Sequence, residues 1–241
     1  MDTNPASTVP GPQTVVALEQ VSKTYRLGDV AVPALTSVTM AITRQRFTMI
    51  VGPSGSGKTT LLNLIGCIDS PSSGWITACG QDVTTLPDNA LTDFRARNIA
   101  FVFQTFNLFP VLTAFENVEY PLLLLGMKAA ERRERCLAML EQVGLADQRH
   151  HRPNQLSGGQ RQRVAIARAL VKAPEIVLAD EPTANLDSRT GATIIELMRK
   201  IQHEQAVSFI FSTHDPQLIS HAEETFLIRD GQVVDHRTEV R

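Results

Sequence analysis

Short apolar runs recur along the chain, and each ends at a glycine-rich or polar segment. These runs are Phe47–Val51, Ile99–Phe103, Ile176–Asp180 and Val207–Thr213. They are rich in β-branched and aromatic residues, and their length suits a strand better than a helix. We therefore predict that each run is a buried β-strand and that the segment after it carries the chemistry.

Other segments have the composition of helices. Thr59–Ile65 follows the first apolar run after a glycine-rich turn, and Gln160–Leu170 has apolar residues spaced to form one buried face. Ala129–Arg135 is charged and helix-favouring, which is typical of a solvated helix face. A chain of 241 residues with this alternation suits one large α/β domain with a modest helical insertion.

The turn after the first strand reads Gly-Pro-Ser-Gly-Ser-Gly-Lys-Thr over residues 52–59, which fits the phosphate-binding pattern G-x-x-x-x-G-K-[ST]. Glycines let successive N–H groups point at one anion, and the following helix adds the positive end of its dipole. An ordinary Gly/Ser turn is the alternative. The predicted ATP-binding residues here are Gly52, Pro53, Ser54, Gly55, Ser56, Gly57, Lys58, Thr59 and Thr60.

Two carboxylates end the strand Ile176–Asp180. Asp180 is placed to hold Mg²⁺, partly through water, together with the hydroxyl of Thr59. Glu181 is placed as the general base that polarises the attacking water. Phosphoryl transfer needs mainly positioning and charge neutralisation, so a metal and one base suffice. By itself, an acidic strand end would be only a solvated polar segment.

The pentapeptide Leu156–Gln160 reads Leu-Ser-Gly-Gly-Gln. Taken in order, the phosphate loop, this pentapeptide and Asp180-Glu181 resemble the nucleotide-binding subunit of an ABC transporter. The resemblance implies an α/β P-loop NTPase of the ABC type, with a RecA-like core, an antiparallel β layer and a helical subdomain. It also implies an ATPase that uses ATP and Mg²⁺.

The resemblance assigns further roles by position. Gln104 is similar to the glutamine that ligates Mg²⁺ and water, and His214 is similar to the histidine that contacts the γ-phosphate and supports Glu181. Tyr25 is similar to the aromatic residue that stacks on adenine. The family also implies contacts to the ATP of a second subunit through Ser157, Gly158, Gly159, Gln160 and Asp187.

The family implies a dimer in which each ATP lies between one phosphate loop and the opposite pentapeptide. One copy of each motif in the chain favours a homodimer. Residues 1–14, with three prolines, are predicted to be a mobile tail. Residues 15–241 are predicted to form the nucleotide-binding domain, with a helical subdomain at roughly 106–167 and with Trp75–Thr77 in the antiparallel layer.

The composition limits which partners and which cellular location we expect for this chain. The formal net charge of −2 gives no basic surface for nucleic acid, so we expect no nucleic-acid partner. No apolar run is long enough to span a bilayer; Pro121–Met127 is much too short and is expected to pack within the insertion. The N-terminus lacks the pattern of a secretory signal. We therefore expect a location at the cytoplasmic face of the inner membrane, reached through separate permease subunits. Cys67, Cys79 and Cys136 have no metal-ligand spacing and are expected to be free thiols.

Subfamily features are found in Phe103–Val118, in His151–Pro153 and in Ala179–Asp187. These stretches resemble the lipoprotein-release and macrolide-export ATPases of the LolD and MacB type. That resemblance implies export or mechanotransmission of lipoprotein, lipid, peptide or drug, with a permease that carries a large periplasmic domain. Phe106–Phe109 would help to seat the permease's coupling helix, although the same spacing also suits core packing.

Three other functions remain open from the residues. An importer ATPase shares every catalytic motif. A regulatory ATPase of the cell-division type would use the same switch without moving a solute. A soluble kinase shares the phosphate loop, but the pentapeptide has no role in one.

Overall fold

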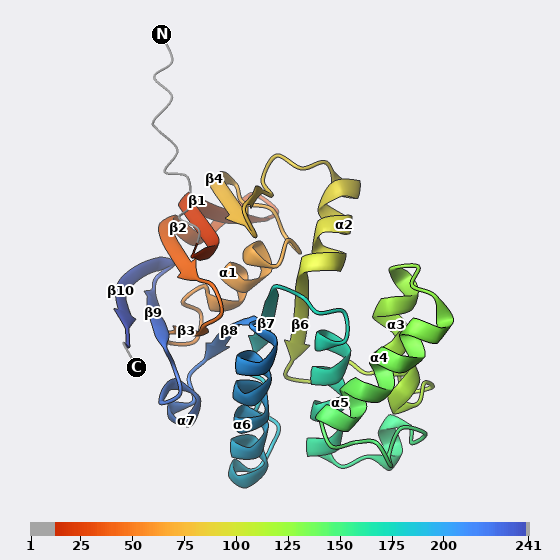
Figure 1. Cartoon of the computed structure of the whole chain (residues 1–241). Helices are drawn as coiled ribbons and strands as arrows, with labels where there is room; N and C mark the ends of the chain where they lie inside the picture. The colour runs from red at the N-terminus through yellow and green to blue at the C-terminus, as the bar shows by residue number, and fades with distance from the viewer. Residues whose placement is uncertain (1–12, 240–241) are drawn as a thin grey trace.

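The computed structural model describes residues 13–239. The tail predicted over residues 1–14 lies almost wholly outside them, and the first strand already begins at Thr14. Figure 1 shows two sheets with a helix between them, and further helices on the far side of the larger sheet. Among the described residues, no helix is both long enough and apolar enough to cross a membrane.

The larger sheet has six strands in the order β10-β9-β3-β8-β7-β6. Strands β9, β3, β8, β7 and β6 are parallel neighbours, and β10 pairs antiparallel with β9. The nearly continuous apolar runs of β3, β7 and β8 are buried on both faces, as a covered parallel sheet requires, whereas β9 alternates and β10 is largely exposed. All four predicted strands are present, and the bounds are β3 Phe47–Val51, β6 Ile99–Phe103, β7 Ile176–Asp180, β8 Ser208–Thr213, β9 Glu224–Arg229 and β10 Gln232–Thr238.

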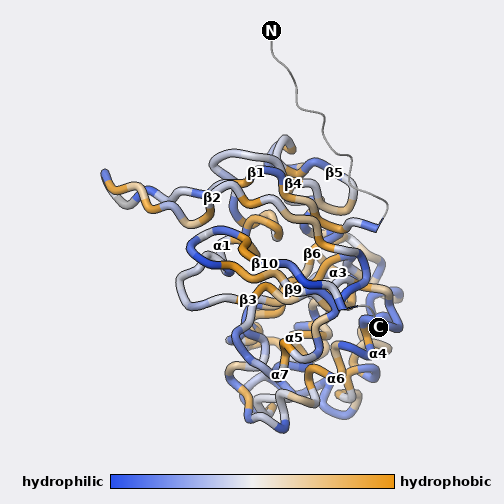
Figure 2. Tube along the Cα trace, turned by 90° about the vertical axis from the view of Figure 1, so that its left-hand side faces the viewer, coloured by the Kyte–Doolittle hydropathy of each residue, from blue (hydrophilic) through white to orange (hydrophobic). Residues whose placement is uncertain are grey.

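The smaller sheet is antiparallel, in the order β2-β1-β4-β5, which confirms the predicted antiparallel layer and the place of Trp75–Thr77 in it. The hairpin between β1 and β2 projects from this layer (Figure 2), and it exposes Val30 and Val32. The bounds are β1 Thr14–Leu27, β2 Val30–Thr43, β4 Ser73–Ala78 and β5 Gln81–Asp82.

Helices cover both faces of the larger sheet. One core lies between the two sheets around α1, and the other packs β3, β6, β7 and β8 against α3–α6. Between β6 and β7 the chain forms α3, α4 and α5, and α5 runs three residues past position 167, the predicted end of the helical subdomain. The bounds are α1 Lys58–Ile65, α2 Asp88–Asn98, α3 Ala114–Leu124, α4 Ala129–Gln142, α5 Gly158–Leu170, α6 Ser188–Gln205 and α7 Pro216–Ile219, with a 3-10 turn η1 at Pro153–Gln155.

The leucine-rich stretch after Pro121 packs only in part. Leu122 is fully buried in α3, but Leu123 and Leu124 are more than half exposed. On a helix, successive residues point 100° apart, so a continuous apolar run cannot all face the core. The expectation that this stretch packs within the insertion therefore holds for Leu122 but not for Leu123 and Leu124.

Candidate ATPase site

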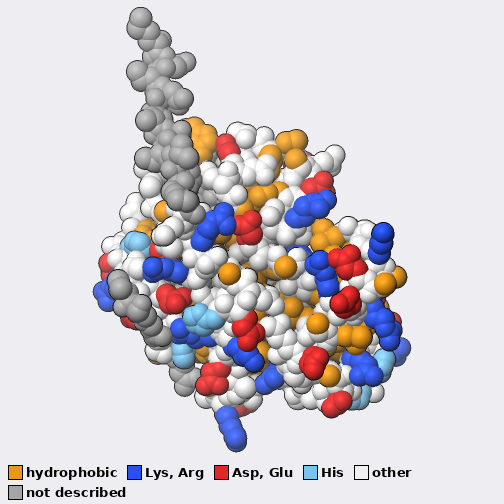
Figure 3. Space-filling model, in the orientation of Figure 1, with side chains coloured by type: hydrophobic (Ala, Val, Ile, Leu, Met, Phe, Trp, Pro, Cys, Tyr) orange, Lys and Arg blue, Asp and Glu red, His pale blue; other side chains and the backbone are white. Residues whose placement is uncertain are grey.

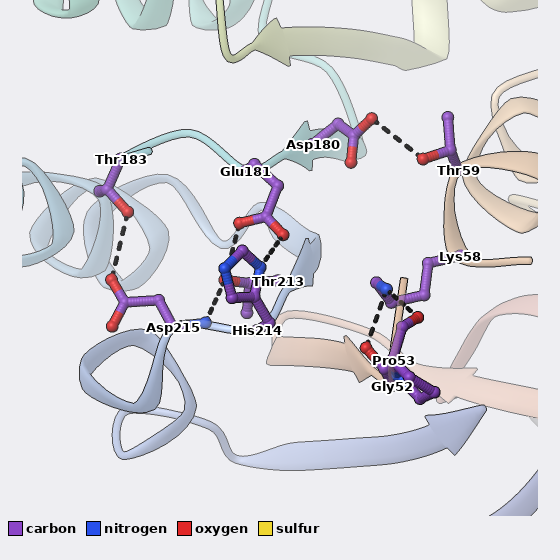
Figure 4. Close-up of polar contacts among 10 residues, drawn as sticks. All are labelled: Gly52, Pro53, Lys58, Thr59, Asp180, Glu181, Thr183, Thr213, His214 and Asp215. Atoms are coloured by element: carbon purple, nitrogen blue, oxygen red, sulfur yellow. Dashed lines mark hydrogen bonds and ion pairs between the residues drawn. The ribbon is translucent and has the colours of Figure 1, made fainter. Parts of the chain in front are cut away.

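The phosphate loop joins β3 to α1, and its glycines have a structural reason. Gly57 has a φ of +103° as the N-cap of α1, and a Cβ there would lie 2.6 Å from the carbonyl oxygen of Ala34. A larger residue would be strained and would push β2 away from the loop. The Nζ of Lys58 donates to the carbonyl oxygens of Gly52 and Pro53, each at 2.9 Å (Figure 4). The ammonium group is thereby held over the loop whose N–H groups are suited to phosphate.

Oxygen ligands meet where β7 ends beside α1. The hydroxyl of Thr59 donates to Oδ2 of Asp180 at 3.3 Å, and Gln104, at the end of β6, lines the same cleft. Hydroxyl, carboxylate and amide oxygens are the ligands that Mg²⁺ prefers, and Mg²⁺ usually takes few protein ligands beside substrate phosphates. These residues therefore fit the metal that the sequence predicts.

Glu181 follows β7 and faces β8. Its Oε1 lies 2.6 Å from Nδ1 of His214, and its Oε2 accepts from the hydroxyl of Thr213 at 3.4 Å (Figure 4). The backbone at Glu181 has a φ of +46°, a left-handed conformation that is unusual for a residue with a side chain. The bond from its N–H to the carbonyl of Ser212, at 3.0 Å, helps to hold it. Strained residues cluster at functional sites, which fits the role predicted for Glu181.

These groups share one cleft of about 680 Å³. It forms because β3, β8, β7 and β6 are parallel neighbours, so that their carboxyl ends and the following loops meet at one edge. Two lining residues, Ala34 and Ser212, were not among the predicted site residues; their place depends on how β2 and β8 pack, and neither carries a signal in the sequence. Its lining comprises Ala34, Gly52, Pro53, Ser54, Gly55, Gly57, Lys58, Thr59, Thr60, Gln104, Asp180, Glu181, Ser212 and His214.

The remaining predicted site residues do not line this cleft. Ser56 lies within the loop, and its buried hydroxyl has no hydrogen-bond partner among residues 13–239; Tyr25 lies in β1. Ser157 is the N-cap of α5 and forms a capping box with Gln160, so the pentapeptide opens that helix as expected. Asp187 caps α6 in a similar way.

The pentapeptide instead packs against the segment that follows β7. A Cβ on Gly158 would lie 3.5 Å from Leu186, and one on Gly159 would lie 2.6 Å from Cγ2 of Thr190. The five residues predicted to reach a second ATP therefore form one group, because the pentapeptide and Asp187 meet at the starts of α5 and α6.

Three side chains that the sequence analysis did not single out connect these parts. Gln162 is fully buried in α5, and its Nε2 donates to the carbonyl of Pro182 at 2.7 Å, next to Glu181. Asn185 donates to the carbonyl of Gln104 at 3.0 Å. Arg168 donates to the carbonyls of Phe106 and Asn107, at 2.8 and 2.5 Å. Glutamine and arginine in a helix usually face water, so no sequence signal marked these contacts.

A second cleft, of about 540 Å³, lies between α2 and β6 on one side and α3 and α5 on the other; we call it the α2–α3 groove. Hydrophobic side chains gather over this part of the face in Figure 3. Three of its lining residues are basic and none is acidic. The lining comprises Thr92, Arg95, Ala96, Ile99, Ala100, Phe101, Phe103, Asn107, Phe109, Tyr120, Pro121, Leu124, Arg168, Ala169 and Lys172.

Comparison with known proteins places the chain. Residues 35–184 match the family model described as ABC transporter. An uncharacterised ABC transporter ATP-binding protein of Thermotoga maritima is 48% identical over 219 residues, which cover 91% of this chain and 93% of that protein. The chain therefore belongs to the ATP-binding proteins of ABC transporters, and it is an ATPase with the P-loop fold.

Two further relatives refine the comparison. The macrolide export ATP-binding/permease protein MacB of Brucella melitensis is 46% identical over 224 residues, covering 93% of this chain and 34% of that protein. The chain thus spans about a third of that relative. The cassette MJ0796 of Methanocaldococcus jannaschii, solved as a post-hydrolysis dimer bound to ADP and phosphate, aligns with a TM-score of 0.84 at 44% identity, over 92% of this chain and 98% of that one. The predicted resemblance, including its MacB type, is confirmed.

Proposed function

We propose that two copies of this chain bind two Mg²⁺-ATP between them and power a separate permease. In each site one copy supplies the cleft at the strand ends and the other supplies Ser157–Gln160 and Asp187. The observation that carries this proposal is the separation of the two groups. The cleft holds a loop for phosphate, oxygen ligands and a carboxylate base, while the pentapeptide presents a helix N-terminus away from it.

Within the cleft, phosphate binding, proton transfer and metal binding fall to different residues. The loop N–H groups and Lys58 bind the phosphates, and Glu181 accepts a proton from the attacking water. His214, 2.6 Å from Glu181, orients that carboxylate and reaches toward the γ-phosphate. Thr59, Asp180 and Gln104 would hold Mg²⁺, which when bound would neutralise charge on the phosphate oxygens.

Hydrolysis then acts as a switch on the dimer. The γ-phosphate bridges the two copies, so its release weakens an interface that ATP had closed. The dimeric MJ0796 structure with ADP and phosphate supports a paired arrangement for this chain. In the same chain, Gln162 and Arg168 link α5 to the loops on either side of the cleft, which would let closure of the interface reach the helical insertion.

Export or mechanotransmission is the direction we favour, at the cytoplasmic face of the inner membrane. Support comes from the identity to MacB, a macrolide export protein in which the ATP-binding part and the permease share one chain. We propose that a separate permease with a large periplasmic domain takes the place of MacB's second part. An importer ATPase remains the nearest alternative, and a regulatory ATPase of the cell-division type is the next.

We further propose that the α2–α3 groove seats the permease's cytoplasmic segment. Phe109 and Tyr120 stand at its rim, 40% and 38% exposed, with ring centroids 4.8 Å apart. Exposed apolar groups of this size mark interaction surfaces. Phe106, by contrast, lies partly buried under Arg161, whose guanidinium is 5.3 Å from the ring centroid, so the contact surface centres on Phe109.

The charge of the groove specifies the chemistry of that segment. Arg95, Arg168 and Lys172 line it, and burial lowers the pKa values of Arg168 and Lys172, to about 8 for Lys172. Each of these cations donates to backbone carbonyl oxygens, but no carboxylate lines the groove, so an incoming carboxylate would add the charge compensation that carbonyls do not supply. We therefore expect the docking segment to be apolar with at least one Asp or Glu.

The test begins with the tagged Glu181→Gln variant in its native host. Membranes are solubilised gently with Mg²⁺-ATP, and the co-purifying proteins are identified. A permease with a large periplasmic domain would support export or mechanotransmission. A many-helix permease with a solute-binding protein would make the chain an importer subunit, and a cell-wall hydrolase or its activator would favour the regulatory function.

Charge reversal then tests the groove. Arg95→Glu should reduce recovery of the permease at least about tenfold, because repulsion replaces attraction at a desolvated contact. Arg97→Glu is the matched control, since Arg97 is exposed on the same helix and does not line the groove. Equal recovery with both variants would contradict the docking assignment. If replacing an Asp or Glu of the permease segment by Lys restored recovery of the permease with the Arg95→Glu variant, that residue would be identified as the partner carboxylate.

A further inference from the structure

The hydroxyl of Tyr25 is tied to a carboxylate outside the ATPase cleft. It donates to Oδ2 of Asp69 at 3.0 Å, while Oδ1 of the same carboxylate accepts from Nζ of Lys23 at 2.6 Å. The Lys23 ammonium also lies 5.0 Å from the centroid of the Tyr25 ring. Tyr25 is 36% exposed. One partner therefore holds the tip of the ring, and the other lies over one of its faces.

Asp69 is itself firmly placed. It follows the last turn of α1, and its backbone N–H donates to the carbonyl of Asn63. The N–H of Ser70 donates to Oδ1 of Asp69 at 2.8 Å. Burial would raise the pKa of this carboxyl, but the hydrogen bonds from Lys23, Ser70 and Tyr25 outweigh it and lower the pKa below its ordinary value. Asp69 is thus a fixed anion at the carboxyl end of α1.

The hydrogen bond between Tyr25 and Asp69 is not needed to attach β1 to the segment after α1. The N–H of Ser72 donates to the carbonyl of Ser22 at 2.8 Å, and the N–H of Thr24 donates to Oγ of Ser72 at 3.0 Å. These bonds already attach β1 to the segment after α1. Lys23 adds a further bond to the backbone of that segment, from Nζ to the carbonyl oxygen of Ser70 at 2.8 Å, whereas the phenol hydroxyl donates to the side chain of Asp69 and so acts on the ring.

We propose that Asp69 and Lys23 are positioning residues that set Tyr25 for stacking on the base of the bound nucleotide. Helix α1 begins at the phosphate loop and spans eight residues, which is about 12 Å. The phosphate loop thus lies at the start of α1, and Asp69, in the turn that follows its end, orients the stacking ring. Lys23 covers one face of the ring and leaves the opposite face for a purine.

This inference rests on the proposed function, because it takes Tyr25 as the adenine contact. It adds that a correctly shaped ring is not enough. Tyr25→Phe keeps the whole aromatic face and removes only the bond to Asp69. If stacking alone sets affinity, that variant binds ATP like the unchanged chain.

The experiment measures dissociation constants by titration calorimetry with Mg²⁺-ATP, in the Glu181→Gln background so that the ligand survives. Tyr25→Phe and Asp69→Ala should each raise Kd about three- to tenfold. The double variant should bind ATP no more weakly than the more affected single variant, because both changes remove the same Tyr25–Asp69 hydrogen bond. Asp82→Ala is the control, an exposed aspartate of the same β layer that does not contact Tyr25.

Inorganic tripolyphosphate, which has no base, should bind all of these variants equally. An unchanged Kd for ATP in Tyr25→Phe, or additive effects in the double variant, would overturn the positioning role. The Tyr25→Ala variant separates failure of the positioning role from failure of the assignment of Tyr25 as the base contact. If it leaves ATP affinity intact, Tyr25 is not the base contact; if the unchanged chain binds no ATP, the proposed function itself fails.

Discussion

The cleft at the strand ends and the pentapeptide at the start of α5 belong to the same proposed reaction, but they are built differently. In the cleft, side chains from different elements already bond one another: Thr59 of α1 bonds Asp180 at the end of β7, and Glu181 after β7 bonds His214 after β8. At α5, the side chains of Ser157 and Gln160 form a capping box with each other's backbone N–H groups, and the glycines pack near Leu186 and Thr190. Under the proposed function, one region is a site within a chain, and the other is half of a site that needs a second copy.

The largest expected effect tests the cleft. Glu181→Gln should lower kcat by at least about a hundredfold, because an amide cannot accept the proton of the attacking water. The Kd for Mg²⁺-ATP should stay within about threefold, since the phosphate loop is untouched. Steady-state hydrolysis and calorimetry measure the two quantities. A variant that retained fast hydrolysis would remove Glu181 as the base.

A paired measurement separates the two regions. In the Glu181→Gln background, Ser157→Arg should abolish ATP-dependent dimerisation, because a long cation fills the helix start that faces the partner, while ATP binding by each copy stays unchanged. Lys58→Ala should lose both ATP binding and ATP-dependent dimerisation, since the change removes a phosphate contact. Light scattering with and without Mg²⁺-ATP gives the oligomeric state. Reduced ATP affinity in the Ser157→Arg copy would place the pentapeptide in its own chain's site.

The link between the regions is tested by Gln162→Leu. The change leaves the carbonyl of Pro182 buried without its donor, which should destabilise the fold by about 1–3 kcal/mol. It should also lower kcat several-fold with little change in KM, because Pro182 adjoins Glu181. Thermal unfolding and kinetics are compared with those of Gln205→Leu, which changes an exposed glutamine at the end of α6, outside both proposed site regions. A loss of stability with unchanged kcat would reduce Gln162 to a packing role.

The smallest effect concerns acid stability in the β layer. The pKa of Asp69 is lowered in the fold, so its contribution is fully present above about pH 4 and is lost as the pH falls through the folded value. The free energy of unfolding of the unchanged chain should exceed that of Asp69→Asn at pH 7, by less than about 1 kcal/mol because the ion pair is partly exposed. The difference should vanish near pH 2. A difference that persisted there would assign the effect to packing.

Several features were readable without the structure because they are local. The phosphate loop, its strand and its helix depend on neighbouring residues with special backbone geometry, and Ser157 at a helix start follows the capping pattern. The four buried strands followed from apolar runs. Helix α2 was not predicted, because its sequence is polar and only Phe94 is buried, so periodicity gave no signal.

The sequence by itself determined which chemistry is present: an anion-binding loop, two carboxylates at the end of a buried strand, and a pentapeptide that is separate from both in the sequence. It determined this because each motif lies within a few adjacent residues. Only the tertiary structure decided what meets what. Strand order brought His214 to Glu181 and Asp180 to Thr59, helix packing set Gln162 on Pro182, and the turn after α1 set Asp69 on Tyr25. Such pairs are separated by many residues, and a contact of that kind depends on how elements pack, which no local pattern records.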